Sequence, residues 1–213
     1  MLSELLKNKN LFYDLYTIDK NVAEQYRQMP CPLCGGPLYF ANYLRKPRGE
    51  PEGVSEKCFI RFSLCCGTEG CRHRVMPPSC RFIGRKIYWH IVILVILSDW
   101  HNKTTNIFKL SKLFGVSRNT IGRWIVFYQD IFPSSPQWQL IRGQVAASIK
   151  SNELPANLVN YFLSFKSSAK EALVSCLSFL SQGAGIYKKS GQDNPTQKTG
   201  IFFNKKINYE VVP

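Results

Sequence analysis

The stretch Cys31-Pro-Leu-Cys34-Gly-Gly, followed about thirty residues later by Cys65-Cys66-Gly-Thr-Glu-Gly-Cys71, decides how the first half of this chain folds. A Cys-x-x-Cys turn that ends in glycine brings two thiolates and the backbone amides of the turn onto one Zn²⁺ ion. Taken alone, the first pair could equally be a redox pair. The second cluster and the strand-like sequence between the two indicate two knuckles joined by a hairpin, so we predict a zinc ribbon.

The expected ligands of one structural Zn²⁺ are Cys31, Cys34, Cys66 and Cys71. The gap between the last two is wider than the usual two residues, which leaves Cys65 or His73 as a substitute ligand. Four thiolates close the coordination shell and leave no position for an activated water, so the ion is expected to be structural. The other cysteines are expected to be small buried hydrophobic residues, namely Cys58, Cys65, Cys80 and Cys176.

The charge balance points to a polyanionic partner. Lys and Arg number 28 against 14 Asp and Glu, a net charge of +14, which fits nucleic acid or an acidic membrane surface and fits a small neutral metabolite poorly. The first residues carry an early acid and no long apolar core, so we expect reduced thiols and a cytoplasmic protein. The apolar run 87–97 covers about half of the ~20 residues that a membrane helix requires, which predicts a buried helix and no membrane partner.

The predicted fold class is α+β, mainly α, with a small β zinc ribbon followed by a three-helix helix-turn-helix unit and additional C-terminal helices. Residues 1–29 are expected to form a helical N-terminal appendage of two short helices, with Asp19 as the cap between them. The ribbon is assigned to 30–80, the helix-turn-helix to 81–132, the C-terminal helices to 133–182 and a basic, mobile tail to 183–213. The expected helices after the ribbon are 83–98, 106–114, 117–131, 137–148, 154–165 and 167–180.

The segment 109–124, Lys-Leu-Ser-Lys-Leu-Phe-Gly-Val-Ser-Arg-Asn-Thr-Ile-Gly-Arg-Trp, has the spacing of a helix-turn-helix. Gly115 is expected to end the first helix in the left-handed conformation, Val116 to fill the turn and Ser117 to cap the second helix. The apolar positions predicted to face the core are Ile107, Leu110, Leu113 and Phe114 in the first helix and Ile121, Trp124, Ile125 and Tyr128 in the second.

With that face buried, the second helix offers a polar face to double-stranded DNA. Its base- and phosphate-contacting residues are expected to be Arg118, Asn119, Thr120 and Arg123. The alternative is an ordinary helical hairpin with a solvated basic face.

Two further basic stretches are candidate DNA contacts. The loop Arg45-Lys46-Pro47-Arg48-Gly49 is either an extended arm that enters a minor groove or a solvated hairpin tip, since Pro47 blocks helix and Gly49 allows close approach. A second patch is expected to contact phosphates and consists of Arg72, Arg74, Arg81, Arg85 and Lys86.

The segment 109–124 resembles the homeodomain-like helix-turn-helix of transposases and transcription factors. Together with Asn42-Tyr43-Leu44-Arg45-Lys46-Pro47-Arg48-Gly49 and the stretch Arg61-Phe62-Ser63-Leu64-Cys65-Cys66-Gly67 through Cys71-Arg72-His73-Arg74, it is similar to a family of small bacterial proteins associated with insertion sequences. The resemblance covers about 31–131. It implies a bacterial, nucleoid-associated protein that binds DNA around mobile elements, through the four cysteines and the exposed face of the second helix.

We expect no catalytic activity. A two-metal transposase or nuclease of the ribonuclease-H class needs three carboxylates on a mixed sheet, and no run of alternating strands follows residue 131. The acids after the ribbon are Asp99, Asp130, Glu153, Glu171, Asp193 and Glu210.

The sequence thus predicts a non-catalytic, zinc-dependent DNA-binding protein that aids a transposase or regulates its expression. Its expected partners are double-stranded DNA, a transposase and a second copy of the chain, paired through the flanking helices. The alternatives are a DNA-targeting fragment of a transposase, a protein-interaction adaptor whose charge is incidental, and an RNA- or ribosome-associated zinc-ribbon protein. The last would stack bases on Tyr39, Phe40 and Tyr43.

Overall fold

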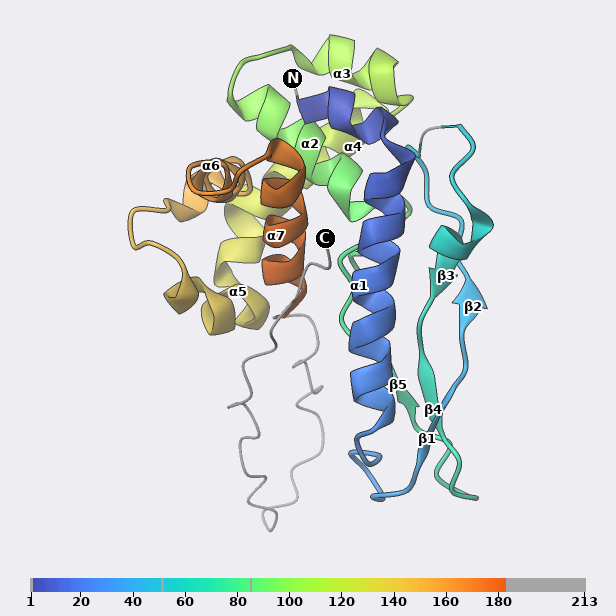
Figure 1. The fold of residues 1–213 in the computed structure, drawn as a ribbon. Helices are drawn as coiled ribbons and strands as arrows, with labels where there is room; N and C mark the ends of the chain where they lie inside the picture. The colour runs from blue at the N-terminus through green and yellow to red at the C-terminus, as the bar shows by residue number, and fades with distance from the viewer. Residues whose placement is uncertain (1, 51, 85, 183–213) are drawn as a thin grey trace.

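The computed structural model describes residues 2–50, 52–84 and 86–182, and it is mainly helical with a small sheet (Figure 1). This agrees with the predicted mainly α, α+β class. The predicted tail 183–213 and Arg85 lie outside the described residues.

Helix α2 (His90–His101) forms the centre of the core. Every residue from Ile91 to Leu97 is buried. The elements that pack around it are the N-terminal 3₁₀ helix η1 (Leu2–Lys7), α3 (Ile107–Phe114), α4 (Arg118–Val126), α6 (Ala156–Leu163) and α7 (Ala169–Gln182). The prediction of a buried helix here is confirmed, and none of the described helices combines the length and apolarity that crossing a bilayer requires. The predicted start at residue 83 is wrong, because Phe82 forms a β-bridge with Trp89 and Gly84 has a φ of 49° in the left-handed region.

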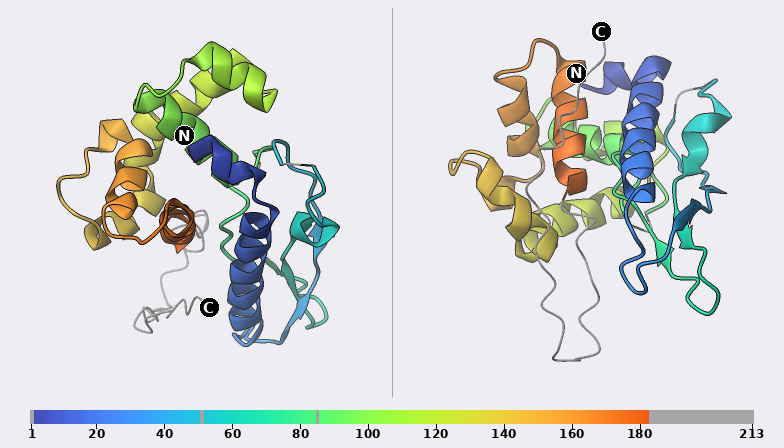
Figure 2. Two further views of the ribbon diagram at one scale, coloured as in Figure 1. Left: turned by 45° about the horizontal axis from the view of Figure 1, so that its top comes forward. Right: turned by 60° about the horizontal axis from the view of Figure 1, so that its bottom comes forward.

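The N-terminal region is built differently from the prediction. One long helix, α1 (Lys9–Arg27), follows η1, and its cap is Asn8, whose side chain accepts a hydrogen bond from the Asn10 amide at 3.0 Å. Asp19 therefore caps nothing and lies buried in the middle of α1. The helix lies between the strands on one side and α7 on the other (Figures 1 and 2).

Two small antiparallel sheets occupy the region assigned to the ribbon. The first has the order β1-β4-β5, formed by β1 (Leu38–Phe40), β4 (Leu64–Cys66) and β5 (Arg74–Val75). Its register pairs Leu38 with Cys66 and Leu64 with Val75. The second pairs β2 (Tyr43–Leu44) with β3 (Ile60–Arg61), and the short 3₁₀ helix η2 (Glu56–Phe59) precedes β3.

Helices α3 (Ile107–Phe114) and α4 (Arg118–Val126) are joined by a tight turn with the predicted local structure. Gly115 has a φ of 60° in the left-handed region, Val116 is fully buried, and the Ser117 hydroxyl accepts a hydrogen bond from the Thr120 amide at 3.2 Å. The predicted burial of Leu113 is wrong: its side chain is 58% exposed, because α3 contacts the core mainly through Leu110.

The chain continues through the π-helical turn η3 (Phe127–Ile131) and the 3₁₀ turn η4 (Phe132–Ser134) into the C-terminal helices. These are α5 (Pro136–Ile141), η5 (Arg142–Gln144), η6 (Ser151–Glu153), α6 (Ala156–Leu163) and α7 (Ala169–Gln182). The helix expected at 137–148 ends early, since Val145 is extended. Helix α7 contacts α6, α5, α2 and α1, which closes the core (Figure 2).

A buried ion pair fastens α1 to the segment between the strands and α2. The Arg81 Nε donates to Asp19 Oδ2 at 2.7 Å, and neither side chain is more than 1% exposed. The other two guanidinium nitrogens donate to the carbonyls of Cys58 (2.6 Å) and Ile60 (2.8 Å). Asp19 also accepts from the Cys80 amide at 2.6 Å and from the Ser79 hydroxyl. Every polar group of the pair is therefore partnered.

Replacing Arg81 with Met should lower the free energy of unfolding by about 3–5 kcal/mol, because it leaves the Asp19 carboxylate buried without a compensating positive charge. The matched control is Arg27→Met, which breaks the exposed pair with Glu24 and should cost about 1 kcal/mol or less. Urea denaturation followed by circular dichroism measures both. An equal decrease in the free energy of unfolding in the two variants would show that the buried pair stabilises the fold no more than the exposed pair does.

Candidate metal centre and basic surface

Four cysteines converge where the ends of the first sheet meet two turns. The Sγ atoms of Cys31 and Cys71 lie 3.8 Å apart and those of Cys34 and Cys66 lie 3.4 Å apart. All four sulfur atoms lie within 4.8 Å of one another. These separations are far longer than the ~2.05 Å of a disulfide bond. The four thiols can hold one metal ion, and they are the four ligands predicted from the sequence.

Glycines let the two cysteine turns approach closely. Gly36 passes so near the second turn that a Cβ there would lie 2.0 Å from Thr68 Oγ1 and 3.3 Å from Cys66 Sγ. Gly35 and Gly70 have φ values of 73° and 79°, which L-residues with side chains rarely adopt. The Thr68 amide donates to Cys66 Sγ at 3.4 Å, which ties the second turn to the cluster.

The alternation of side chains along β4 indicates which of Cys65 and Cys66 belongs to the cysteine cluster. Successive side chains of β4 point to opposite faces, so Cys66 points to the cluster and Cys65 points away. The Cys65 thiol lies 3.6 Å from the Arg72 carbonyl instead. Cys58, Cys80 and Cys176 are fully buried as expected, whereas Cys65 is only partly buried.

Neighbouring groups in the cluster shift the pKa values of Cys34 and Cys71 in opposite directions. Hydrogen bonding, led by the Gly36 backbone and followed by Cys71 and Thr68, lowers the pKa of Cys34 to about 6. At Cys71 the His73 backbone hydrogen bond lowers the pKa, but the neighbouring thiols and burial outweigh it and raise the pKa to about 12. Cys34 therefore loses its proton more readily than Cys71, and a bound cation would favour the thiolate form of both.

The second candidate site is the exposed face around the first turn of α4. Arg118, Asn119 and Arg123 are exposed there as predicted. Thr120 is only partly exposed, and its hydroxyl lies 2.9 Å from the Ser117 hydroxyl and accepts a hydrogen bond from Arg123.

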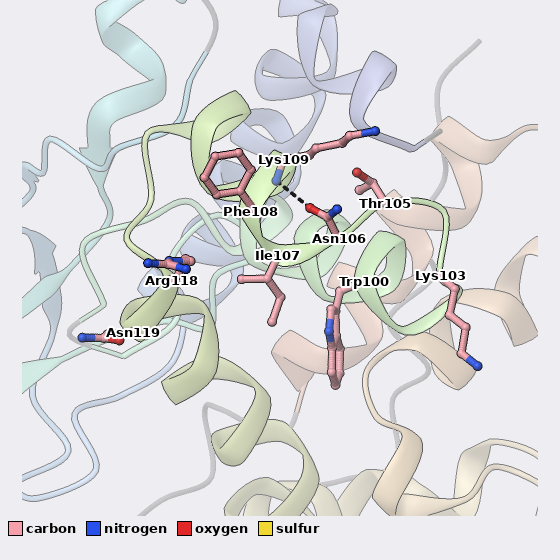
Figure 3. Close-up of a pocket in the computed structure, with 9 residues that line it drawn as sticks. All are labelled: Trp100, Lys103, Thr105, Asn106, Ile107, Phe108, Lys109, Arg118 and Asn119. Carbon is pink, nitrogen blue, oxygen red and sulfur yellow. Dashed lines mark hydrogen bonds between the residues drawn. The ribbon is translucent and has the colours of Figure 1, made fainter.

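Arg118 and Asn119 border a groove that also reaches the start of α3 (Figure 3). The sequence reasoning missed the other wall of this groove. It is formed by Trp100, Lys103, Thr105, Asn106, Ile107, Phe108 and Lys109, with the Lys109 amide donating to Asn106 Oδ1 at 2.9 Å.

The basic loop after β2 is not a free arm. Arg45 donates to the carbonyls of Gly84 at 2.8 Å and Lys86 at 2.5 Å, and its guanidinium lies 5.3 Å from the centre of the Phe82 ring. Lys46 and Arg48 in the same loop are exposed. Only these two of the three predicted contacts present a free charged group.

The second basic patch is also divided. Arg72 and Arg74 are exposed beside the cysteine turns, whereas Arg81 is buried in the ion pair with Asp19 and cannot reach a phosphate. Arg85 lies outside the described residues.

No protein-family model, curated protein or solved structure matches this chain.

We predict that the full chain, purified without chelators, holds one metal ion. Cys66→Ser should lose it, whereas the adjacent control Cys65→Ser should retain it, because the Cys65 thiol faces away from the cluster. Elemental analysis of both variants against protein concentration measures the stoichiometry. Retention in Cys66→Ser together with loss in Cys65→Ser would reverse the assignment.

Proposed function

We propose that this chain is a non-catalytic DNA-binding protein in which a zinc ribbon is joined to a helix-turn-helix unit formed by α2, α3 and α4. It would act for an insertion sequence, as an accessory of the transposase or as a regulator of its expression. The observation that carries the DNA-binding proposal is the first turn of α4, which exposes Arg118 and Asn119 beside a basic groove.

Zinc is the metal that best fits the four thiols. A tetrahedral site with Zn–S bonds of about 2.3 Å has sulfur atoms about 3.8 Å apart. The contacts of 3.8 Å and 3.4 Å in the cluster are close to this edge length. All-sulfur tetrahedral sites are typical of zinc or iron–sulfur centres, and two glycine-containing turns joined by short strands favour a structural zinc. The ion would hold the two turns together, and it would have no open position for a substrate.

The charge of the α3–α4 region supports a nucleic-acid partner. Residues 100–129 contain no acid, and their basic residues are Lys103, Lys109, Lys112, Arg118 and Arg123. In the described part of the chain none of these five forms an ion pair with a carboxylate. A protein surface of this kind attracts phosphates and releases their counterions on binding.

The position of α4 supports base reading over simple charge attraction. Ile121, Trp124 and Tyr128 are buried against the core, which turns the opposite face outward. Residues in the first turn of a recognition helix reach furthest into a major groove, where Arg pairs with guanine and Asn with adenine. Arg123, further along α4, is better placed for a backbone phosphate.

A second candidate partner is single-stranded RNA. Tyr39 and Phe40 on β1 and Tyr43 on β2 are 59%, 39% and 41% exposed, and exposed aromatic rings on short strands can stack on bases. This surface lies on the sheets and does not include α4.

Selection from a randomised duplex library should enrich a defined site. Arg118→Ala should then weaken binding to that site by about 1–3 kcal/mol and change binding to random duplex little, because it removes a base contact. Arg72→Ala should weaken binding to both duplexes alike, since a phosphate contact carries no sequence information. Fluorescence anisotropy of labelled duplexes measures each affinity.

The control is Arg142→Ala, which removes the same charge from an exposed position at the end of α5. It should leave the affinity for the selected site nearly unchanged. No enriched duplex, together with tight binding of single-stranded RNA that is lost in Tyr39→Ala, would overturn the DNA proposal in favour of RNA.

A further inference from the structure

A separate pocket lies on the other side of the first turn of α4. Three segments that are far apart in sequence form its walls: the loop after β2, the residues before α2, and the turn into α4. Its polar lining consists of Arg48, Lys86, Tyr88, Ser117, Thr120 and Arg123.

The backbone holds the cations of this pocket in place. The Arg48 amide donates to the Ile87 carbonyl at 2.8 Å, and the Trp89 amide donates to the Arg48 carbonyl at 3.4 Å. Arg45 fastens the same two segments through its hydrogen bond to the Lys86 carbonyl at 2.5 Å. Gly49 allows this approach, since a Cβ there would lie 3.1 Å from Val92 on α2. Backbone hydrogen bonds thus bring Arg48 and Lys86 together, and neither side-chain charge takes part in these bonds.

The turn into α4 supplies the third cation and the hydroxyl groups. Ser117 Oγ and Thr120 Oγ1 lie 2.9 Å apart, and an Arg123 guanidinium nitrogen lies 3.2 Å from Thr120 Oγ1. The Lys86 ammonium lies 4.3 Å from the centre of the Phe127 ring, which holds it close to α4. Guanidinium, ammonium and hydroxyl groups are the donors that proteins use for a phosphate group.

The charges in this pocket are unbalanced. Three cations line it, and no Asp or Glu is among its described lining residues. Burial, and then repulsion from Arg123, lower the pKa of Lys86. The repulsion among these like charges raises the free energy of the empty pocket. A bound anion would neutralise that repulsion and lower the free energy.

We propose that this pocket binds a phosphate group, held by Arg48, Lys86 and Arg123 with the hydroxyls of Ser117 and Thr120. The phosphate can be a backbone phosphodiester of DNA or belong to a free phosphate compound. The first source rests on the proposed DNA-binding function, and the second does not.

The first test is a titration of the full chain with inorganic phosphate at constant ionic strength, with chloride as the reference anion. The NMR signals of the Gly115, Ser117 and Thr120 amides should shift and saturate. The double variant Arg48→Gln/Arg123→Gln should bind phosphate at least tenfold more weakly, and the control Arg142→Gln should bind as the parent does. Circular dichroism establishes that each variant is folded.

Absence of saturable shifts, or equal phosphate affinity in the double variant, would overturn the proposal. This titration needs no DNA, so it gives an answer even if the proposed DNA-binding function fails.

The second test identifies the source of the phosphate. If the pocket holds a DNA phosphodiester, the slope of log K against log salt for duplex binding should fall by about 0.9 for each phosphate contact that the double variant loses. An unchanged slope, with phosphate binding lost, assigns the pocket to a free phosphate compound.

Discussion

The buried pair between Asp19 and Arg81 is the contact on which the arrangement of the chain depends. Arg81 reaches α1 through Asp19, the start of β3 through the Ile60 carbonyl, and α2 through its own carbonyl, which accepts from the His90 amide at 2.9 Å. A charged pair is costly to bury, and here the cost is offset because each of the three guanidinium nitrogens donates to an oxygen. The rings of Tyr16, Phe62 and Phe82 enclose the guanidinium at 4.9–5.4 Å. One side chain thus sets the position of the sheets relative to the helices.

The Asp19–Arg81 ion pair joins α1, the start of β3 and α2, elements that connect the region of the cysteine cluster with the α3–α4 unit. The cysteine turns lie at one end of α1 and the α3–α4 unit lies at the other (Figure 1). Around the cluster the buried apolar residues are only Cys31, Leu38, Leu64 and Cys66 among those described, a core too small to hold the strands by itself. A bound metal would supply much of that stability. Its effect would reach α2 and the loop before it through the strands and Arg81.

Short-range features could be predicted from the sequence because short-range physics decides them. The four clustered cysteines follow from two glycine-containing turns, although the choice of Cys66 over Cys65 needed the structure. The turn between α3 and α4 follows from a left-handed glycine and a serine cap. The wrong predictions concern residues whose contacts are distant in sequence. Asp19 looks like a cap until Arg81 is brought to it, and residues 83–89 look helical until Arg48 pairs with Ile87. Local composition carries no information about contacts between distant segments. For the same reason the sequence did not predict that residues of the stretch from Trp100 to Lys109 line a groove with Arg118 and Asn119.

The basic loop after β2 shows how one run of like residues comes to serve two roles. The two arginines of this loop have different surroundings, since Arg45 is partly buried and Arg48 is exposed. Arg45 turns toward the segment before α2 and donates to the carbonyls of Gly84 and Lys86. Arg48 turns toward α4 and stays exposed in the pocket with Arg123. Arg45 fixes the backbone of the loop, and Arg48 therefore presents its charge beside α4 from a fixed backbone. An anion bound there, as we propose, would cost little conformational entropy of the loop.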